Sequence, residues 1–394
     1  MDNEKSKYNN DKKEKNISLK EEKHIKTLNK KTKRINKIQN FDKLNELNKN
    51  DITECANYNL EHDNIEFLFY LVKDSYFSSL TDNTFCVFKS INEIIYLIYS
   101  NKDKSIISYN LINNQKINEI KNAHDEYIIN FRYYLDTINK RDLILSISKY
   151  DNNIKLWNIY NYECLLNLMS VNIIGEIYSA YFINDKYQNY IITSNYQSNF
   201  IDDINRVEPI KVYDFNGNII KEINDSDEST LYIYSYYENK NLNNYILTGN
   251  KGYIKSYDYN KNKVYHKYGN NDFYSHNSIV INNNASLIEI IESSFNGYIR
   301  IRNFHSEELL NIIKVSHGSV NTICLWNNNY LFAGTIDYKI ILIDLKNVKI
   351  IKEYEQNKES VLTIRKINHP KYGECLISSQ SWKNGKIKLW AYKK

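Results

Sequence analysis

The stretch Asp151–Asn158, DNNIKLWN, decides the fold, because its last five residues follow a figure that recurs along the chain. The figure is an isoleucine, any residue, a mostly apolar residue, an aromatic residue or its substitute, and usually Asp or Asn. It recurs at intervals of 41 to 56 residues and begins at Ile106, Ile154, Ile210, Ile254, Ile299, Ile340 and Ile387. The mean interval of about 47 residues can hold four short strands with their turns, whereas a unit of 34 residues suits a helix pair. The sequence therefore predicts a repeat protein made of β-sheets.

Each figure has the pattern of a half-buried strand. In IKLW, Ile154 and Leu156 share one face of a strand while Lys155 lies on the other. An apolar run and a short polar turn precede the figure, as LILSIS precedes YDNN. In five of the seven units Asp or Asn stands three residues ahead of the isoleucine, where it accepts backbone hydrogen bonds in a turn. Each unit is thus predicted to contain strand, turn and strand.

From about Phe85 to the C-terminus these units resemble WD-repeat proteins, the seven-bladed propellers typified by the G-protein beta subunit. DNNIKLWN carries the resemblance best, and a histidine dipeptide precedes two units, Ala123-His124 and Ser316-His317. No unit keeps an actual Trp-Asp pair. The resemblance implies an all-β fold of seven four-stranded antiparallel blades around a central channel, with the figure in the third strand of each blade.

The last figure, IKLWA, ends too close to Lys394 for a fourth strand to follow. In the family that the chain resembles, a strand from the start of the chain closes the ring, and the candidate here is Glu66–Val72, EFLFYLV. Closure would also remove an unpaired strand edge. We therefore expect a propeller over residues 56–394, preceded by a tail at 1–55.

The tail differs in composition from the rest of the chain. Residues 1–50 hold fifteen Lys or Arg and eight Asp or Glu, a net charge of +7, whereas the remainder carries −2. Few aromatic residues and a high charge are typical of disordered segments. Lys30-Lys31-Thr32-Lys33-Arg34 fits a simple nuclear-import pattern, and a basic arm is also able to contact nucleic acid. A solvated Lys-rich tail without either role is the other interpretation.

Other motifs exclude several classes of function. Met1 is followed by charged residues, and no stretch approaches 18 apolar residues, so we expect no secretory leader and no membrane partner. Five scattered cysteines do not make a disulfide framework. No metal-binding, phosphate-binding or dinucleotide-binding motif occurs, so no metal and no cofactor are expected. The prediction is an intracellular protein of the cytoplasm or the nucleus.

His124, Ser146 or Ser148, Asp151 and Trp157 form the clearest set of polar residues. They include the residue types of a Ser-His-Asp catalyst, but no exposed nucleophile, oxyanion hole or substrate cleft is signalled. The resemblance instead implies a buried hydrogen-bond network that joins loop, turn and strands. We therefore predict no catalytic residue and no enzyme activity.

A second set of the same kind, His317, Thr335 and Asp337, is expected to be incomplete. Ile343 stands where the first set has its tryptophan. Without an indole N–H, one donor of the network is missing.

Function is therefore expected at the surface. In the family that the chain resembles, partners dock on the face with the loops before the first strand and between the second and third strands. Trp382, in SSQSWKNGK, is expected in such a turn, either as a partner anchor or packed on the neighbouring blade. Tyr150 and Phe295 occupy comparable turns. The long turn 195–208, with Phe200 and Arg206 as contact residues, is either a disordered outgrowth or a binding loop.

The sequence thus predicts a non-catalytic scaffold that binds other proteins or peptides within a multiprotein assembly. The alternative is a nuclear propeller, associated with RNA or chromatin, whose basic tail contacts nucleic acid.

Overall fold

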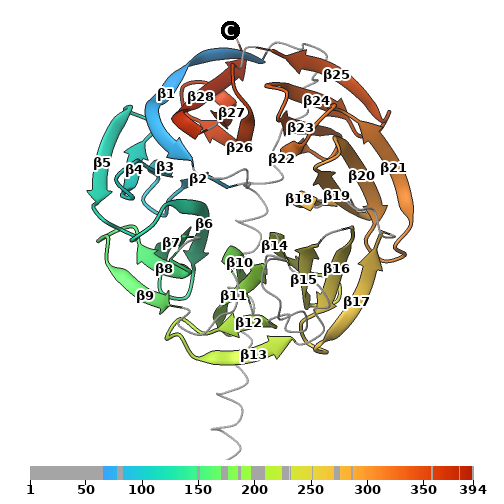
Figure 1. Ribbon diagram of the computed structural model, residues 1–394, viewed down its shortest axis with the longest axis horizontal. Helices are drawn as coiled ribbons and strands as arrows, with labels where there is room; N and C mark the ends of the chain where they lie inside the picture. Colours follow the sequence, from blue (N-terminus) through green and yellow to red (C-terminus); the bar gives the residue numbers. More distant parts are fainter. Residues whose placement is uncertain are drawn as a thin grey trace, which may run out of the picture. The chain divides into compact units, whose positions relative to one another are not determined.

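The computed structural model describes residues 65–392, except for short gaps at 78–82, 149–150, 170–175, 185–187, 197–208, 224–229, 231, 251, 270–275, 285–286, 356–357 and 381. The described residues form seven sheets of four antiparallel strands, arranged as a ring in Figure 1. The fold is a seven-bladed β-propeller, which confirms the predicted fold class. Each blade follows the chain order of its strands from the channel to the rim, apart from the last.

The strands of the first three blades are β2 (Phe85–Lys89), β3 (Ile95–Ser100), β4 (Ile106–Asn110), β5 (Gln115–Ile120), β6 (Ile128–Asp136), β7 (Arg141–Ser148), β8 (Asn153–Asn158), β9 (Cys164–Met169), β10 (Glu176–Asn184), β11 (Asn189–Tyr196), β12 (Ile210–Tyr213) and β13 (Ile219–Ile223). Those of the next three are β14 (Tyr232–Glu238), β15 (Asn243–Gly249), β16 (Ile254–Asp258), β17 (Lys263–Tyr268), β18 (His276–Asn283), β19 (Ile288–Ser294), β20 (Tyr298–Asn303), β21 (Leu309–Lys314), β22 (Val320–Asn327), β23 (Tyr330–Thr335), β24 (Ile340–Asp344) and β25 (Lys349–Tyr354). The last blade holds β26 (Val361–His369), β27 (Gly373–Gln380), β28 (Trp382–Tyr392) and β1 (Ile65–Phe77).

The last blade joins the two ends of the ring. β1 pairs antiparallel with β28, and Val72 lies opposite Ile387. In Figure 1 the blue β1 runs along the red sheet of β28, β27 and β26. Val72 and Ile387 pack in one core cluster with Phe85 and Leu97 of the first blade. Closure by an N-terminal strand is therefore confirmed, and β1 is longer than the predicted Glu66–Val72.

The fifth residue of the repeated figure has a structural task. In five blades it ends the third strand, and in the blade of β10–β13 Asp214 directly follows that strand. In all six its side-chain oxygen accepts a backbone N–H from the turn toward the fourth strand. The carbonyl or carboxylate oxygens that do so belong to Asn110, Asn158, Asp214, Asp258, Asn303 and Asp344, at 2.8–3.0 Å. Asn and Asp favour such turns. The seventh figure ends in Ala391, which lies within β28 opposite Glu66 of β1.

The turn before the figure is also repeated in five of the blades. The residue two positions ahead of the isoleucine has a positive φ at Asn152 and at Gly297. Asparagine tolerates this backbone conformation better than most residues, and glycine has no steric penalty. At Gly297 the need is absolute, because an added Cβ would lie 2.1 Å from the carbonyl oxygen of Ser316.

A matched pair of side chains joins the second and third strands of two blades. Trp157 Nε1 donates to Ser146 Oγ at 2.8 Å, and Trp390 Nε1 donates to Ser378 Oγ at 2.8 Å. In the blade of β18–β21 the register places Glu292 at the serine position and Arg302 at the tryptophan position. The blades thus place chemically different pairs of side chains, Ser with Trp or Glu with Arg, at the same two positions.

In that blade the pair is ionic. Arg302 Nε lies 3.2 Å from Glu292 Oε1, and His276 Nδ1 lies 3.1 Å from Glu292 Oε2. Glu292 is completely buried. Burial alone would raise the pKa of Glu292, but His276, Arg302 and Arg300 outweigh it, so that the pKa is lowered and the group stays ionised. Each charge in this blade therefore depends on its partners.

We predict that Arg302→Trp lowers the free energy of unfolding by about 3 to 5 kcal/mol, because Glu292 would remain buried with one cation fewer. Glu292→Ser combined with Arg302→Trp should recover a large part of this loss, since it installs the pair found at Ser146 and Trp157. Chemical denaturation of the wild type, both single variants and the double variant measures the coupling. A double variant no more stable than Arg302→Trp would contradict the matched-pair interpretation.

We predict that Val72→Asp lowers the free energy of unfolding by about 3 kcal/mol or more, because it places a charge in the seam between the last and first blades. The neighbouring Lys73 is exposed, so Lys73→Ser should stay within about 0.5 kcal/mol of the wild type. Thermal unfolding followed by circular dichroism compares them. Equal melting temperatures for both variants would show that β1 does not hold the ring closed.

Candidate functional site

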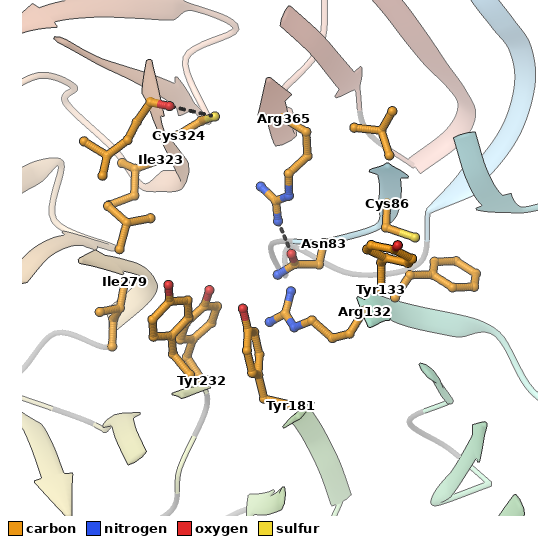
Figure 2. A pocket seen from close by; sticks show the side chains of 15 residues that line it. Asn83, Cys86, Arg132, Tyr133, Tyr181, Tyr232, Ile279, Ile323, Cys324 and Arg365 are labelled. Atoms are coloured by element: carbon orange, nitrogen blue, oxygen red, sulfur yellow. Dashed lines mark hydrogen bonds between the residues drawn. The ribbon is translucent and has the colours of Figure 1, made fainter. Parts of the chain in front are cut away.

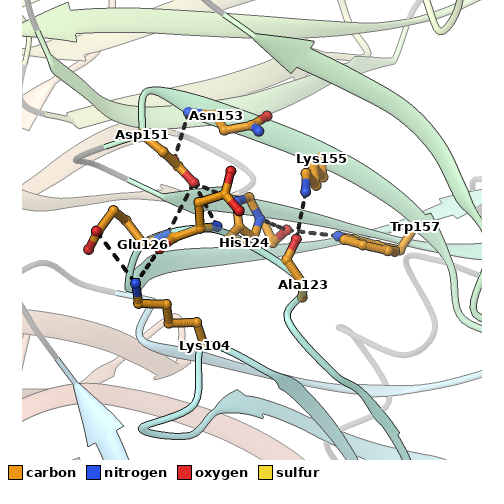
Figure 3. Close-up of polar contacts among 10 residues, drawn as sticks. Lys104, Ala123, His124, Glu126, Asp151, Asn153, Lys155 and Trp157 are labelled. Carbon is orange, nitrogen blue, oxygen red and sulfur yellow. Dashed lines mark hydrogen bonds and ion pairs between the residues drawn. The ribbon is translucent and has the colours of Figure 1, made fainter.

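The structure brings the four residues of the predicted network together. His124 lies in the turn before β6, Ser146 in β7, Asp151 in the turn before β8, and Trp157 in β8. His124 Nε2 lies 2.7 Å from Ser146 Oγ, which also accepts the indole N–H of Trp157. His124 Nδ1 lies 3.7 Å from Asp151 Oδ2. Figure 3 shows this chain of contacts linking the turn to the two strands.

Asp151 also holds the turn itself. Its Oδ2 accepts the backbone N–H groups of Asp125 and Glu126, and its Oδ1 accepts that of Asn153. Burial raises the pKa of Asp151, but hydrogen bonds, that with His124 first, outweigh burial and lower the pKa to about 2. Burial lowers the pKa of His124 itself, and the Asp151 carboxylate only partly opposes this effect. The pair ties the turn between β5 and β6 to the turn before β8.

Asp151 contacts His124, and His124 contacts Ser146, in the same sequence of contacts as in a Ser-His-Asp catalyst. The serine, however, is not accessible to a substrate. Ser146 has no solvent-exposed surface, and its oxygen already contacts both the His124 ring and the Trp157 indole. A nucleophile must reach the substrate carbon, which requires an open path. In this structure the three groups serve packing and hydrogen bonding inside a blade.

The second set is arranged differently. Asp337 Oδ2 accepts hydrogen bonds from Ser316 Oγ at 2.5 Å and from the backbone N–H of His317 at 3.0 Å. The His317 side chain is exposed, and Thr335 Oγ1 exchanges hydrogen bonds with the backbone of Lys339. Ser316 therefore takes the role that the sequence suggested for His317.

The predicted partner-binding residues have different outcomes. Phe295 lies in the turn between β19 and β20 and is 40% exposed. Tyr150, Phe200 and Arg206 lie outside the described residues, as does most of the turn 195–208.

The expected position of Trp382 in a turn is wrong. Trp382 begins β28, and its backbone lies opposite Phe77 of β1. β28 extends beyond the pairing with β27, which stops at Ser379 opposite Ile387. The physical reason is the length of β1, whose far end offers hydrogen-bonding partners to the residues before Ile387; Ser75 Oγ, for example, donates to the Gly385 carbonyl at 2.6 Å.

A group of exposed apolar side chains was missed by the sequence analysis. They lie in the turns between first and second strands and between third and fourth strands of two adjacent blades, the end of the ring opposite to Phe295. We call this group the Tyr160 surface, and it consists of Ile91, Ile112, Ile138 and Tyr160. Tyr160 is 77% exposed, the largest fraction among the exposed large apolar side chains of the described residues.

Hydrogen bonds to Asp142 gather the turns of the Tyr160 surface. The backbone N–H of Ile91, in the first blade, donates to Asp142 Oδ2 at 3.1 Å. The backbone N–H of Ile159, beside Tyr160, donates to the Asp142 carbonyl at 3.1 Å. Ser108 Oγ of β4 also contacts Tyr162 Oη of the second blade at 3.1 Å. A signal was present in the sequence, since isoleucine and tyrosine are uncommon choices for tight polar turns.

The ring and its blade networks define the protein class as a β-propeller. No known family model and no curated protein matches the sequence. Among solved structures, that of Raptor from Chaetomium thermophilum is similar, with a TM-score of 0.64, 13% identity, and 87% of this chain covered. The match spans 30% of the Raptor chain, so the likeness concerns part of that protein and shows the fold alone.

The described residues contain no group of three or more His, Cys, Asp or Glu side chains placed to hold a metal ion. None of their elements is a helix with the length and hydropathy needed to cross a membrane.

We predict that Asp151→Asn lowers the free energy of unfolding by about 1 to 3 kcal/mol near neutral pH, because the turn loses a charged acceptor. The lowered pKa of Asp151 stabilises the fold fully above about pH 4, and this contribution is lost as the pH falls toward 2. The difference between wild type and variant should therefore shrink over that range. Denaturant unfolding at several pH values measures it.

Asp103→Asn is the matched control, since Asp103 occupies the same place in the first blade but is exposed. Its effect should stay within about 0.5 kcal/mol. An equal loss in both variants, independent of pH, would contradict the role given to Asp151.

Proposed function

We propose that this protein is a non-catalytic scaffold that binds other proteins within a multiprotein assembly, and that the Tyr160 surface is where a partner docks. The observation that carries the proposal is a set of exposed apolar side chains held on rigid turns at one end of a closed ring. Apolar groups gathered at one place on a surface mark interaction sites more often than isolated ones do.

The turns of the Tyr160 surface are fixed before any partner arrives. Asn158 Oδ1 accepts the N–H of Tyr160 at 3.0 Å, and Asn110 Oδ1 accepts that of Ile112 at 2.9 Å. Binding through a preorganised turn loses less conformational entropy than binding through a flexible loop. Tyrosine adds a large apolar ring with a polar end, which makes it a frequent hot-spot residue. The partner is accordingly expected to present apolar side chains.

The absence of a reachable nucleophile in the Ser146 network supports the non-catalytic part of the proposal. The alternative function, a nuclear propeller that contacts RNA or chromatin, depends on residues 1–50. These residues lie outside the described part of the chain, so that alternative stays a sequence-based expectation.

The test compares proteins captured from cells by the wild type with those captured by a variant carrying Ile138→Ser and Tyr160→Ser. We expect the variant to lose partners that the wild type recovers, because two apolar anchors are removed while the backbone hydrogen bonds of the turns remain. Purified complexes with a recovered partner should then show at least about tenfold weaker binding, or about 1.4 kcal/mol.

Phe295→Ser is the control, since it removes an exposed apolar ring from the opposite end of the ring of blades. It should leave the partners unchanged. Loss of partners with Phe295→Ser alone would move the site to the face expected from the sequence, and equal recovery by all three proteins would reject both surfaces.

A further inference from the structure

The central channel contains a cavity of about 260 Å³. Apart from Asn83, which precedes β2, the residues around it come from the innermost strands of all seven blades, β2, β6, β10, β14, β18, β22 and β26. The volume far exceeds the roughly 15 Å³ that one water molecule requires, and it lies just below the range of about 300–1,000 Å³ usual for small-molecule sites. The cavity is thus large enough for a small ligand.

The charges around the cavity have one sign. Its lining includes two arginines, Arg132 of β6 and Arg365 of β26, and no Asp or Glu. Figure 2 shows both guanidinium groups pointing into the channel, each from a different blade. They also both act on the thiol of Cys86: burial raises its pKa, and Arg365 and Arg132 oppose that effect. Two cations therefore converge on one polar space.

Arg132 has unused hydrogen-bonding capacity. The residue is only 6% exposed, and its Nε and Nη2 atoms are buried without a hydrogen-bond partner among the described residues. Its guanidinium lies over the rings of Tyr181 and Tyr232, at 5.1 and 5.6 Å from their centroids. These ring contacts stabilise the cation but leave its N–H groups unsatisfied. A buried donor of this kind is costly unless a ligand or water accepts from it.

Arg365 is held in position by its neighbours. Its Nη1 donates to the backbone carbonyl oxygen of the preceding residue, Ile364, at 2.6 Å. Its Nη2 donates to Asn83 Oδ1. The Asn83 side chain thus orients Arg365 in the channel, where Figure 2 places Asn83 between the two arginines.

Tyrosines add neutral donors to the same space. Tyr181 and Tyr232 direct their hydroxyl groups into the cavity in Figure 2. Tyr234 also lines it, and burial raises the pKa of Tyr234 well above its ordinary value, so its hydroxyl keeps its proton. The cavity therefore combines two fixed cations with hydroxyl donors.

We propose that the central channel holds a small phosphate-bearing anion, bound by the guanidinium groups of Arg132 and Arg365 and by the hydroxyl groups of Tyr181 and Tyr232. Phosphate is the chemistry that fits best, because a planar guanidinium donates two parallel N–H groups to two oxygens of one phosphate. Its several oxygens accept from donors that approach from different blades. This inference does not depend on the proposed protein-binding function, because that function uses the Tyr160 surface, which shares no residue with the cavity.

The anion would link blades that are distant in the sequence. Arg132, Arg365 and Tyr232 belong to three different blades, and Arg365 belongs to the blade that closes the ring. A bound anion stabilises the folded state because the unfolded chain does not assemble these donors. Phosphate should therefore raise the melting temperature more than chloride does at equal ionic strength.

Isothermal titration calorimetry of the full chain with inorganic phosphate, and separately with glycerol phosphate, tests the site. We expect saturable binding that Arg132→Gln and Arg365→Gln each weaken at least about tenfold, as for loss of a charge-assisted contact. Tighter binding of glycerol phosphate would identify a phosphorylated small molecule as the ligand, and tighter binding of inorganic phosphate the free anion. Either result supports the proposal.

Lys349→Gln, which removes an exposed cation from the outermost strand β25, is the control and should bind as the wild type does. If an arginine variant fails to fold, Arg132→Lys keeps the charge while removing the planar pair of donors, and it should bind more weakly than the wild type. The proposal is wrong if phosphate neither releases heat nor raises the melting temperature beyond chloride. It is also wrong if citrate alone binds, or if the arginine variants bind phosphate as tightly as Lys349→Gln.

Discussion

The pairing of β1 with β28 is the interaction on which the rest of the structure depends. Without β1, the last blade would end at the strand that carries Ile387 and Leu389, and this strand would expose its hydrogen-bonding edge and apolar side chains. The seam is also closed by hydroxyl groups. Thr84 Oγ1 lies 2.9 Å from both Thr363 Oγ1 and Ser379 Oγ, joining the entry of the first blade to the last. The channel has its shape only because this seam is closed.

The features that could be predicted from the sequence are those that depend on local patterns of residues. The figure beginning at Ile154 predicted the third strand, because alternation and turn chemistry are local properties of the chain. The closing strand was predicted from a missing element, since IKLWA leaves no room for another strand. The residues His124, Ser146, Asp151 and Trp157 are also found together, as the resemblance implied.

The candidate sites were harder to predict because they depend on contacts between distant residues. Arg132 and Arg365 are separated by most of the sequence, although only the first blade lies between their blades in the ring, and nothing near either of them in the sequence indicates that they face one cavity. The Tyr160 surface likewise needs the two blades that Asp142 joins. Trp382 shows the opposite error: its polar neighbours are typical of a turn, but pairing with β1 extends the strand.

The ionic pair of Glu292 and Arg302 has a consequence for how such a chain changes over time. In this blade Glu292 lies on the second strand and Arg302 on the third, so replacing either residue alone leaves the other charge without its partner and lowers stability. A single substitution toward the serine and tryptophan pair gives a protein with one unpaired buried charge. Only the double replacement gives a complete pair again. Blades of one ring are therefore separated by barriers in sequence space, although each is a sheet of four antiparallel strands.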